Sequence, residues 1–396
     1  MPTTQLDFEK NIAAWWREVK DDFWGDVKHE TLQLIQRLLE TAMHEELAVY
    51  TQAEWHERTG HARPYRNGCY TRSLSTELGL LPALRVPRSR DGRFRPQVLP
   101  RYQRRQPAVN RLLQDVFLAG VSTRRVGEVV QPLLGVRWSA TTVSTITKAL
   151  DAAVAQFHRR RVLDEYHVLF LDGVHLSAKG ALGATRRVIL VAYGLTVFGR
   201  RALVSFRQAP SESQAAWEAF LNDLFRRGLE GKELRLVVTD GCPGLQAALD
   251  VVYPYAPHQR CWAHKLRNVA AQVPRTVQEP CLRQAKRIYL ASTRRAATSR
   301  FRQWERRWET VAPKAVACLR SDLDDLLTFL TFPAAQRVTL RTTNVIERCF
   351  REVRRRTRPI GCFTNAASCD RIVYAVFHRL NTQWQERPLP AFTQFS

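Results

Sequence analysis

Lysine and acidic residues are both scarce in this chain. Only nine of its 61 basic residues are lysines, so 52 are arginines, and with 37 Asp and Glu residues the formal net charge is +24. Because the planar guanidinium group of arginine can bind a phosphate through two hydrogen bonds, this imbalance favours a polyanion as partner. The alternative is that the arginines only cover solvated surfaces.

Paired cysteines and long hydrophobic runs are also missing. The eight cysteines are scattered without a CxxC pair, and they are too few for a disulfide scaffold in a chain of this length. No segment reaches the roughly 18 consecutive apolar residues of a membrane span, and no secretory signal pattern opens the chain. We therefore expect a soluble, cytoplasmic protein in a reducing compartment, with no membrane partner.

The length and apolar content predict a globular enzyme with more than one domain. A chain of 396 residues exceeds a typical single domain, and 45% hydrophobic residues suffice for buried cores. Changes in sequence pattern divide it into five regions, namely 1–105, 106–157, 158–274, 275–338 and 339–396.

The first region combines a helix with an arginine-rich stretch. Apolar residues recur at helical spacing from about residue 28 to 50, without a visible partner for the buried face. Residues 60–105 are rich in Gly, Pro and Arg, which predicts short strands and loops along a phosphate backbone, or alternatively a solvated linker. We assign DNA contacts in this region to Arg88, Arg90 and Arg93.

Three short helical segments follow between residues 108 and 157. Ser122 and Ser139 stand at N-cap positions, while Gly120 and Gly135 stand where helices end. Closely joined helices of this kind predict a DNA-binding unit like a helix-turn-helix, although any small helical bundle has similar capping and helix-ending residues. The residues expected at the front of the recognition helix are Thr141, Thr142 and Ser144.

From residue 165 onward, apolar runs rich in β-branched residues alternate with helical patterns. Three strands (YHVLFLD, RRVILVAYGL and RALVSFR) come first, followed by helix, strand, helix and strand. This order predicts an α/β protein with a mixed, ribonuclease H-like sheet, preceded by a mainly helical N-terminal DNA-binding region. Residues 275–338 have helical patterns throughout, so we expect an all-helical insertion in this core.

Three acidic residues stand where metal-dependent chemistry is expected. Asp172 and Asp240 end apolar strand patterns, and ligand sites of α/β sheets collect at the carboxyl ends of strands. Alternatively, each begins an Asp-Gly turn. Glu347 opens an arginine-rich helix. Three carboxylates are a usual minimum for holding two divalent ions during phosphoryl transfer, so we expect catalytic residues that bind two Mg²⁺ ions, with Mn²⁺ able to substitute.

Glu347 also has a purely structural interpretation. Asn344 could cap the helix, which would make Glu347 the acid of a capping box. The apolar stripe of this helix, however, comprises Ile346, Cys349, Phe350 and Val353. That stripe leaves Glu347, Arg351, Arg354 and Arg358 along a different face of the helix. We expect these three arginines and Arg355 to contact DNA.

Two histidines, His175 and His264, are further candidates for the site. Cys261 and His264 form a C-x2-H pair, which could be half of a zinc site. Because no second pair has zinc spacing, we favour a packing or hydrogen-bonding role beside the active site. His175 lies close to Asp172 and is better explained as a polar side chain or DNA contact than as a general base.

Several long stretches, in order across about 320 residues, resemble the Mutator-type insertion-sequence transposases of bacteria. They include GHARPYRNGCYTRSL, GVSTRRVGEVV, FLDGVHL, GLTVFGRRALVSF, ESQAAWEAFLNDLFRRGL, VVTDGCPGL, HQRCWAHKLRN and FPAAQRVTLRTTNVIERCFREVRRRTR. The resemblance implies a DDE triad of Asp172, Asp240 and Glu347 and a C-x2-H element of Cys261 and His264. Gly173 departs from it, since alanine is usual after the first Asp.

This resemblance sets the functional expectation. A transposase of this kind binds the terminal inverted repeats of its element in double-stranded DNA, cuts a strand with bound metal and joins the freed end to target DNA. It also implies a homo-oligomer, at least a dimer on DNA. The alternatives are a catalytically silent DNA-binding protein derived from a transposase, and a nuclease that cuts without joining.

Overall fold

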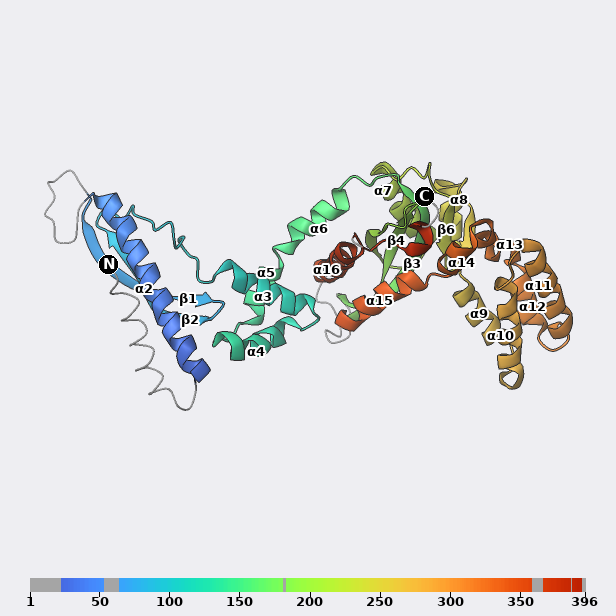
Figure 1. Ribbon diagram of the computed structural model, residues 1–396, viewed down its shortest axis with the longest axis horizontal. Helices are drawn as coiled ribbons and strands as arrows, with labels where there is room; N and C mark the ends of the chain where they lie inside the picture. The colour runs from blue at the N-terminus through green and yellow to red at the C-terminus, as the bar shows by residue number, and fades with distance from the viewer. Residues whose placement is uncertain (1–22, 53–63, 181–182, 358–365, 386, 394–396) are drawn as a thin grey trace, which may run out of the picture. The chain divides into compact units, whose positions relative to one another are not determined.

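The chain forms two compact units, one ending at Thr147 and the other beginning at Lys148 (Figure 1). None of the helices described is long and apolar enough to cross a membrane. The computed structural model describes residues 23–52, 64–180, 183–357, 366–385 and 387–393, with the side chains of 177–186 left out.

The N-terminal unit begins with a long helix packed on a β-hairpin. Helix α2 (Phe23–Thr51) covers strands β1 (Arg66–Thr76) and β2 (Gly79–Ser89), which pair antiparallel. The hairpin is therefore the partner that the helical pattern left unidentified, and its strands of eleven residues are longer than expected. The shared core comprises Met43, Leu74, Leu81, Leu84, Val86 and Leu99.

Three short helices complete this unit, namely α3 (Pro107–Leu118), α4 (Thr123–Leu134) and α5 (Ala140–Thr147). Gly135 ends α4 in the left-handed conformation, with φ 69°. The hydroxyl oxygen of Ser139 accepts the N–H of Thr142 at 3.1 Å, as an N-cap does. The predicted helix boundaries at Gly135 and Ser139 are therefore confirmed.

The last helical segment of the predicted 106–157 region is broken in two. Residues 148 and 149 form a turn, and α6 (Leu150–Arg159) packs within the second unit. Arg371 donates to both carboxylate oxygens of Asp151, at 2.6 and 3.0 Å. The division therefore falls after Thr147 and not after residue 157, because α6 makes its contacts with the second unit.

The second unit contains the predicted mixed α/β core. Its sheet has the order β5-β4-β3-β6-β7, with the first three strands antiparallel, β6 parallel to β3 and β7 parallel to β6. The five strands are β3 (Tyr166–Gly180), β4 (Gly183–Thr196), β5 (Arg201–Ala209), β6 (Leu236–Thr239) and β7 (His258–Arg260).

Helices cover both faces of this sheet. On one face, α7 (Gln214–Arg226) and α8 (Pro243–Val252) pack on Leu169 and Leu171 of β3. On the other face, Tyr193 stacks edge-on with Phe170 and with Trp384 of α16 (Ala366–Gln385). Since side chains alternate along a strand, the even-numbered residues of β3 from Val168 to Leu176 point to the α16 face.

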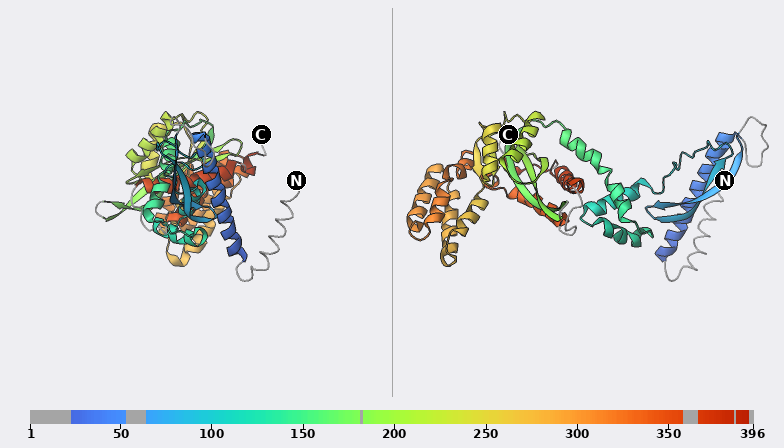
Figure 2. Two further views of the ribbon diagram at one scale, coloured as in Figure 1. Left: turned by 90° about the vertical axis from the view of Figure 1, so that its left-hand side faces the viewer. Right: turned by 180° about the vertical axis from the view of Figure 1, so that it is seen from behind.

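The predicted insertion is helical throughout its described length. After α9 (Trp262–Ala271), its helices lie on the β7 side of the sheet. They form the end of the second unit away from α6, in orange in Figure 2, and the chain then returns through α15 (Asn344–Thr357). A short helix, α17 (Pro390–Thr393), follows α16. The elements of the insertion are α10 (Arg275–Tyr289), α11 (Arg294–Trp308), α12 (Pro313–Arg320), α13 (Leu323–Leu326), a 3₁₀ turn (Thr328–Thr331) and α14 (Ala334–Leu340).

Candidate active site

Asp172 lies within a strand and not at its end. Strand β3 continues beside β4 as far as Gly180, so the predicted strand end at Asp172 and the alternative of an Asp-Gly turn are both wrong there. The pairing of β3 with β6, however, ends at Phe170 and Val238. Asp172 therefore stands just beyond the carboxyl end of the neighbouring parallel strand, where the sheet opens.

Asp240 occupies the position that the sequence predicts. Strand β6 ends at Thr239, and Asp240 is the next residue. One carboxylate oxygen of Asp240 accepts the N–H of Cys242 at 2.9 Å, so this side chain also stabilises the turn before α8. The functional and the turn-forming interpretations of Asp240 are therefore compatible.

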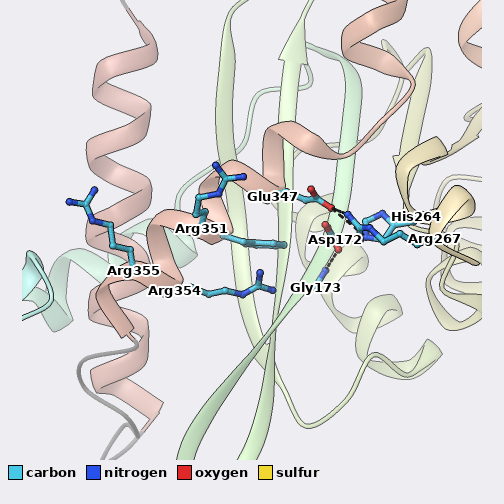
Figure 3. Close-up of a pocket in the computed structure, with 9 residues that line it drawn as sticks. Asp172, Gly173, His264, Arg267, Glu347, Arg351, Arg354 and Arg355 are labelled. Atoms are coloured by element: carbon cyan, nitrogen blue, oxygen red, sulfur yellow. Dashed lines mark hydrogen bonds and ion pairs between the residues drawn. The ribbon is translucent and has the colours of Figure 1, made fainter. Parts of the chain in front are cut away.

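A pocket of about 690 Å³ brings Asp172 and Glu347 together (Figure 3). As an even-numbered residue of β3, Asp172 faces the side of the sheet that α15 and α16 cover. Figure 3 shows the carboxylates of Asp172 and Glu347 turned toward His264 and Arg267. The pocket lining comes from β3, α9 and α15 and comprises Asp172, Gly173, His264, Arg267, Glu347, Phe350, Arg351, Arg354 and Arg355.

The carboxyl group of Asp172 is in an unfavourable environment for its charge. Its exposed fraction is only 6%, and burial followed by the nearby charge of Asp240 raises its pKa to about 7, while His264 opposes the shift. Burial disfavours the ionised carboxylate because it loses hydration, and the second acid disfavours it by repulsion between like charges. This part of the pocket therefore attracts a proton or a cation.

Glu347 contacts α9 and not the start of its own helix. Its Oε1 accepts a hydrogen bond from Nη2 of Arg267 at 2.7 Å and lies 3.6 Å from Nε2 of His264. The backbone N–H of Glu347 donates to the carbonyl of Thr343. The side chain thus extends into the pocket, and the capping-box interpretation does not describe it.

Cys261 and His264 form a buried hydrogen-bonded group with Thr343. The Thr343 N–H and hydroxyl donate to Sγ of Cys261 at 3.3 and 3.4 Å. Burial raises the pKa of Cys261, but its hydrogen bonds with His264 and Thr343 outweigh this effect and lower it overall. The hydrogen bond with Cys261 raises the pKa of His264. The pair thus connects the start of α9 to the residue before α15.

The basic face of α15 follows the predicted pattern. Its apolar stripe, Ile346, Cys349, Phe350 and Val353, is buried, and Glu347 shares the pocket with the arginines. Of the four predicted DNA contacts, Arg351, Arg354 and Arg355 line the pocket, and Arg358 lies outside the described residues. Their binding to DNA stays a prediction.

The predicted DNA contacts of the N-terminal unit lie at its surface. Arg88, Arg90 and Arg93 are exposed, and the first two line a hollow of about 410 Å³ together with Arg95 and Arg101. On α5, Thr141 is exposed and Ser144 is half-buried, whereas the hydroxyl of Thr142 contacts that of Ser139 at 2.9 Å. Thr142 therefore contributes to the helix cap as well.

Two residues near the acids were not predicted. Glu212, just before α7, lies so close to Gly173 that a Cβ atom there would be 2.3 Å from its carboxylate oxygen. The same carboxylate lies 3.3 Å from Nε2 of His175. Arg267 comes from the next turn of α9 after His264. The local sequence pattern identifies neither Glu212 nor Arg267, because these residues come close to the acids only in the folded protein.

The side chains present fit a divalent ion by their chemistry. Mg²⁺ prefers oxygen ligands, and Asp172, Asp240 and Glu347 supply carboxylates. In the residues that the structure describes, no three His, Cys, Asp or Glu side chains are already arranged around one point. Glu347 would have to turn from Arg267 toward Asp172 to complete such a set.

Comparison with known proteins gives the family. Residues 6–387 match the family model described as "Transposase, Mutator family". The chain is 35% identical over 353 residues to the transposase for insertion sequence element ISRM5 of Rhizobium meliloti, covering 89% of this chain and 87% of that protein.

Two further relatives are also transposases for insertion sequence elements. The transposase for IS905 of Lactococcus lactis is 32% identical, with 93% of this chain and 94% of that protein covered. The transposase for IS256 in transposon Tn4001 of Staphylococcus aureus is 31% identical, with 92% of each chain covered. With the family model matching nearly the whole chain, this protein belongs to the Mutator family of transposases.

Proposed function

We propose that this protein cuts and joins DNA to move an insertion sequence, using Asp172, Asp240 and Glu347 as its catalytic acids. The observation that carries the proposal is the environment of Asp172. It is buried, it is repelled by Asp240, and it shares an arginine-lined pocket with Glu347. Burial and repulsion would only destabilise an acid with a purely structural role, whereas a bound cation would stabilise an acid that acts as its ligand.

In this proposal the acids of the chain hold two Mg²⁺ ions, and Mn²⁺ is able to substitute. When bound, the metal supplies Lewis-acid stabilisation of the attacking and leaving oxygens. Asp172 and Asp240 approach from neighbouring strands, and Glu347 approaches from α15. Arg351, Arg354 and Arg355 position the phosphate backbone along the same helix.

The proposed reaction has two steps at one site. Water first attacks a phosphodiester at the end of the element, the P–O bond to the departing 3′ oxygen breaks, and a 3′-hydroxyl is released. That hydroxyl then attacks a phosphate of target DNA, forming a new P–O bond while the target strand breaks. Each step exchanges one P–O bond for another, so no covalent enzyme intermediate is needed.

We further propose that the core is ribonuclease H-like. In this fold three antiparallel strands lie beside two parallel ones, and the order β5-β4-β3-β6-β7 agrees with it. Acids on the first and fourth strands then meet at one edge, which is the placement of Asp172 on β3 and of Asp240 after β6.

We assign recognition of the terminal inverted repeats to the N-terminal unit. Arg88, Arg90 and Arg93 would contact phosphates, and Thr141, Thr142 and Ser144 lie on the short helix α5 of a three-helix group. Because two ends of one element have to be joined, the active form is at least a dimer on double-stranded DNA.

A decisive experiment compares wild type with Asp172→Asn in three assays. On labelled terminal-repeat DNA with a plasmid target and Mg²⁺ or Mn²⁺, wild type should give joined products. The variant should bind the ends with unchanged affinity but give at least a thousandfold less cleavage. In the third assay, Mg²⁺ should raise the melting temperature of wild type more than that of the variant.

The matched control is Asp250→Asn, an exposed acid on α8 that should behave as wild type. Nicks without joining would support the nuclease, and end binding without any cleavage would support a silent binder. Full cleavage by Asp172→Asn would remove this residue from the site.

A further inference from the structure

Helix α11 of the insertion has two sharply different faces. Ala297, Phe301, Trp304 and Trp308 are buried against the rest of the unit. The indole N–H of Trp304 donates to the carbonyl of Cys281 at 3.1 Å, and that of Trp308 donates to Gln284 at 2.9 Å. These two bonds to α10 fix the rotation of α11 about its axis, so its other face is presented in one orientation.

The outer face of α11 borders a hollow of about 910 Å³. The lining positions repeat at intervals of three to four residues, which places them in one stripe along the helix. Over twelve residue steps the stripe is about 18 Å long, since a helix rises about 1.5 Å per residue. Its members are Arg294, Arg295, Thr298, Ser299, Arg302, Glu305 and Arg306.

The positive charge of this stripe is only partly neutralised by the residues that the structure describes, since Arg294 alone of its arginines is paired, with Asp324. Among the described residues, Arg295, Arg302 and Arg306 have no acidic partner. Glu305 is the only acid of the stripe, and its carboxylate is already bound by Nε of Arg320 at 2.7 Å. Three guanidinium groups are therefore available on one side of a rigid helix.

The chemistry of the stripe fits the backbone of duplex DNA. Arginine, serine and threonine side chains are common phosphate contacts, and such contacts carry no sequence information. Duplex DNA rises about 3.4 Å per base pair, so a stripe of about 18 Å spans roughly five base pairs. The stripe is separate from the active-site pocket, because the two share no residue.

We propose that the outer face of α11 is a second DNA-binding surface, which holds the duplex outside the active-site pocket through its phosphates. This inference rests on the proposed function in one respect, namely that DNA is the substrate. It gives the helical insertion a role of its own, as a sequence-independent contact that adds affinity to end recognition by the N-terminal unit.

The test is the salt dependence of duplex binding by the full-length protein. The triple variant R295Q/R302Q/R306Q removes three phosphate contacts, and each contact contributes about 0.9 to the slope of log Kobs against log salt. The slope of the variant should therefore be smaller by about 2.7, and its affinity near physiological salt should fall about tenfold or more. Its melting temperature should match that of wild type, because all three side chains are at the surface.

The matched control is R226Q/R235Q/R283Q, which loses the same charge from the same unit. Arg226 is the last residue of α7, Arg235 directly precedes β6 at the end opposite Asp240, and Arg283 is paired with Glu279 on α10. The control should keep the wild-type slope. An unchanged slope in the α11 variant, or an equal loss in the control, would overturn the proposal. If wild type failed to bind duplex DNA at all, the proposed function would fail with it.

Discussion

Asp172 illustrates how a single residue can lower the stability of the fold that positions it. Its folded-state pKa of about 7 lies above the ordinary value of 3.8 because of burial and the charge of Asp240. Between about pH 4 and pH 7 the folded protein therefore binds a proton that the unfolded chain has released. By linkage, the contribution of Asp172 to stability falls as pH rises through this window and stays unfavourable above it.

We therefore predict that Asp172→Asn stabilises the protein when divalent ions are removed. At pH 8 in EDTA the variant should gain on the order of 2 kcal/mol, or about 5 °C in melting temperature, because a buried charge is replaced by a neutral amide. At pH 4 the difference should largely vanish. Thermal denaturation at both pH values checks this, with Asp250→Asn as control; a variant less stable than wild type at pH 8 would contradict it.

Gly173 and Glu212 form a second test at the residue scale. Gly173 lies in an extended strand, where alanine has no conformational penalty, but its Cβ would approach Glu212 to 2.3 Å and Cγ1 of Val188 to 3.0 Å. We expect Gly173→Ala to displace Glu212 and to cost about 1–2 kcal/mol by overpacking.

The double variant Gly173→Ala with Glu212→Ala should recover part of this loss, because the crowding carboxylate is gone. Chemical denaturation of the two single variants and the double variant gives the coupling free energy. Additive effects would mean that the two side chains do not compete for the same space.

At the scale of elements, Cys261 connects α9 to α15. It is fully buried and accepts two hydrogen bonds from Thr343, the residue before the helix that carries Glu347. Removing the acceptor leaves the buried N–H of Thr343 unsatisfied, which typically costs about 1–3 kcal/mol, whereas the Thr343 hydroxyl keeps its contact with His264.

We predict that Cys261→Ala lowers both stability and DNA cleavage, while Cys261→Ser recovers much of the loss because a hydroxyl oxygen also accepts. Cys369→Ala removes the same volume from a buried site on α16 and should affect stability without a comparable loss of cleavage. Melting temperature and single-turnover cleavage separate the two effects. Equal loss of cleavage in the Cys261 and Cys369 variants would mean that the link does not position Glu347.

The elements themselves were largely predictable, because helix and strand periods are local properties of the sequence. The strands of the core and the all-helical insertion were located from local sequence patterns, and the mixed sheet was inferred from the order of strands and helices. The extension of β3 beyond Asp172 was not predictable, because pairing with β4 and not a local apolar pattern maintains it. The packing of the hairpin on α2 was not predictable either, because its residues are distant in sequence from the helix residues that they contact.

The candidate site was predictable only in part, for a related reason. Asp240 directly follows β6 and Glu347 lies in the first turn of α15, while Asp172 ends a local apolar run inside β3. Glu212 and Arg267 have no such local signal, since an acid before α7 and an arginine on α9 become neighbours of the site only after folding.

At the scale of the whole molecule, the division after Thr147 has a direct physical cause. The side chain of Phe157 on α6 packs against Phe206 of β5 and Tyr374 of α16, with ring centroids 5.6 and 5.5 Å apart. Arg371, which is 5% exposed, pairs with Asp151 on the same helix. Helix α6 is thus part of the second unit, although it directly follows the three helices of the first.

This division predicts the behaviour of fragments. A fragment of residues 148–396 should fold cooperatively, whereas one of residues 160–396 should melt at a clearly lower temperature, because it lacks α6 and leaves the Arg371 guanidinium buried without a partner. In the longer fragment, Asp151→Ala should cost about 2 kcal/mol, the scale of a lost charge-assisted hydrogen bond. Calorimetry on the three proteins measures both effects. Equal melting temperatures for the two fragments would mean that α6 adds no stability to the second unit, and would contradict this explanation of the division.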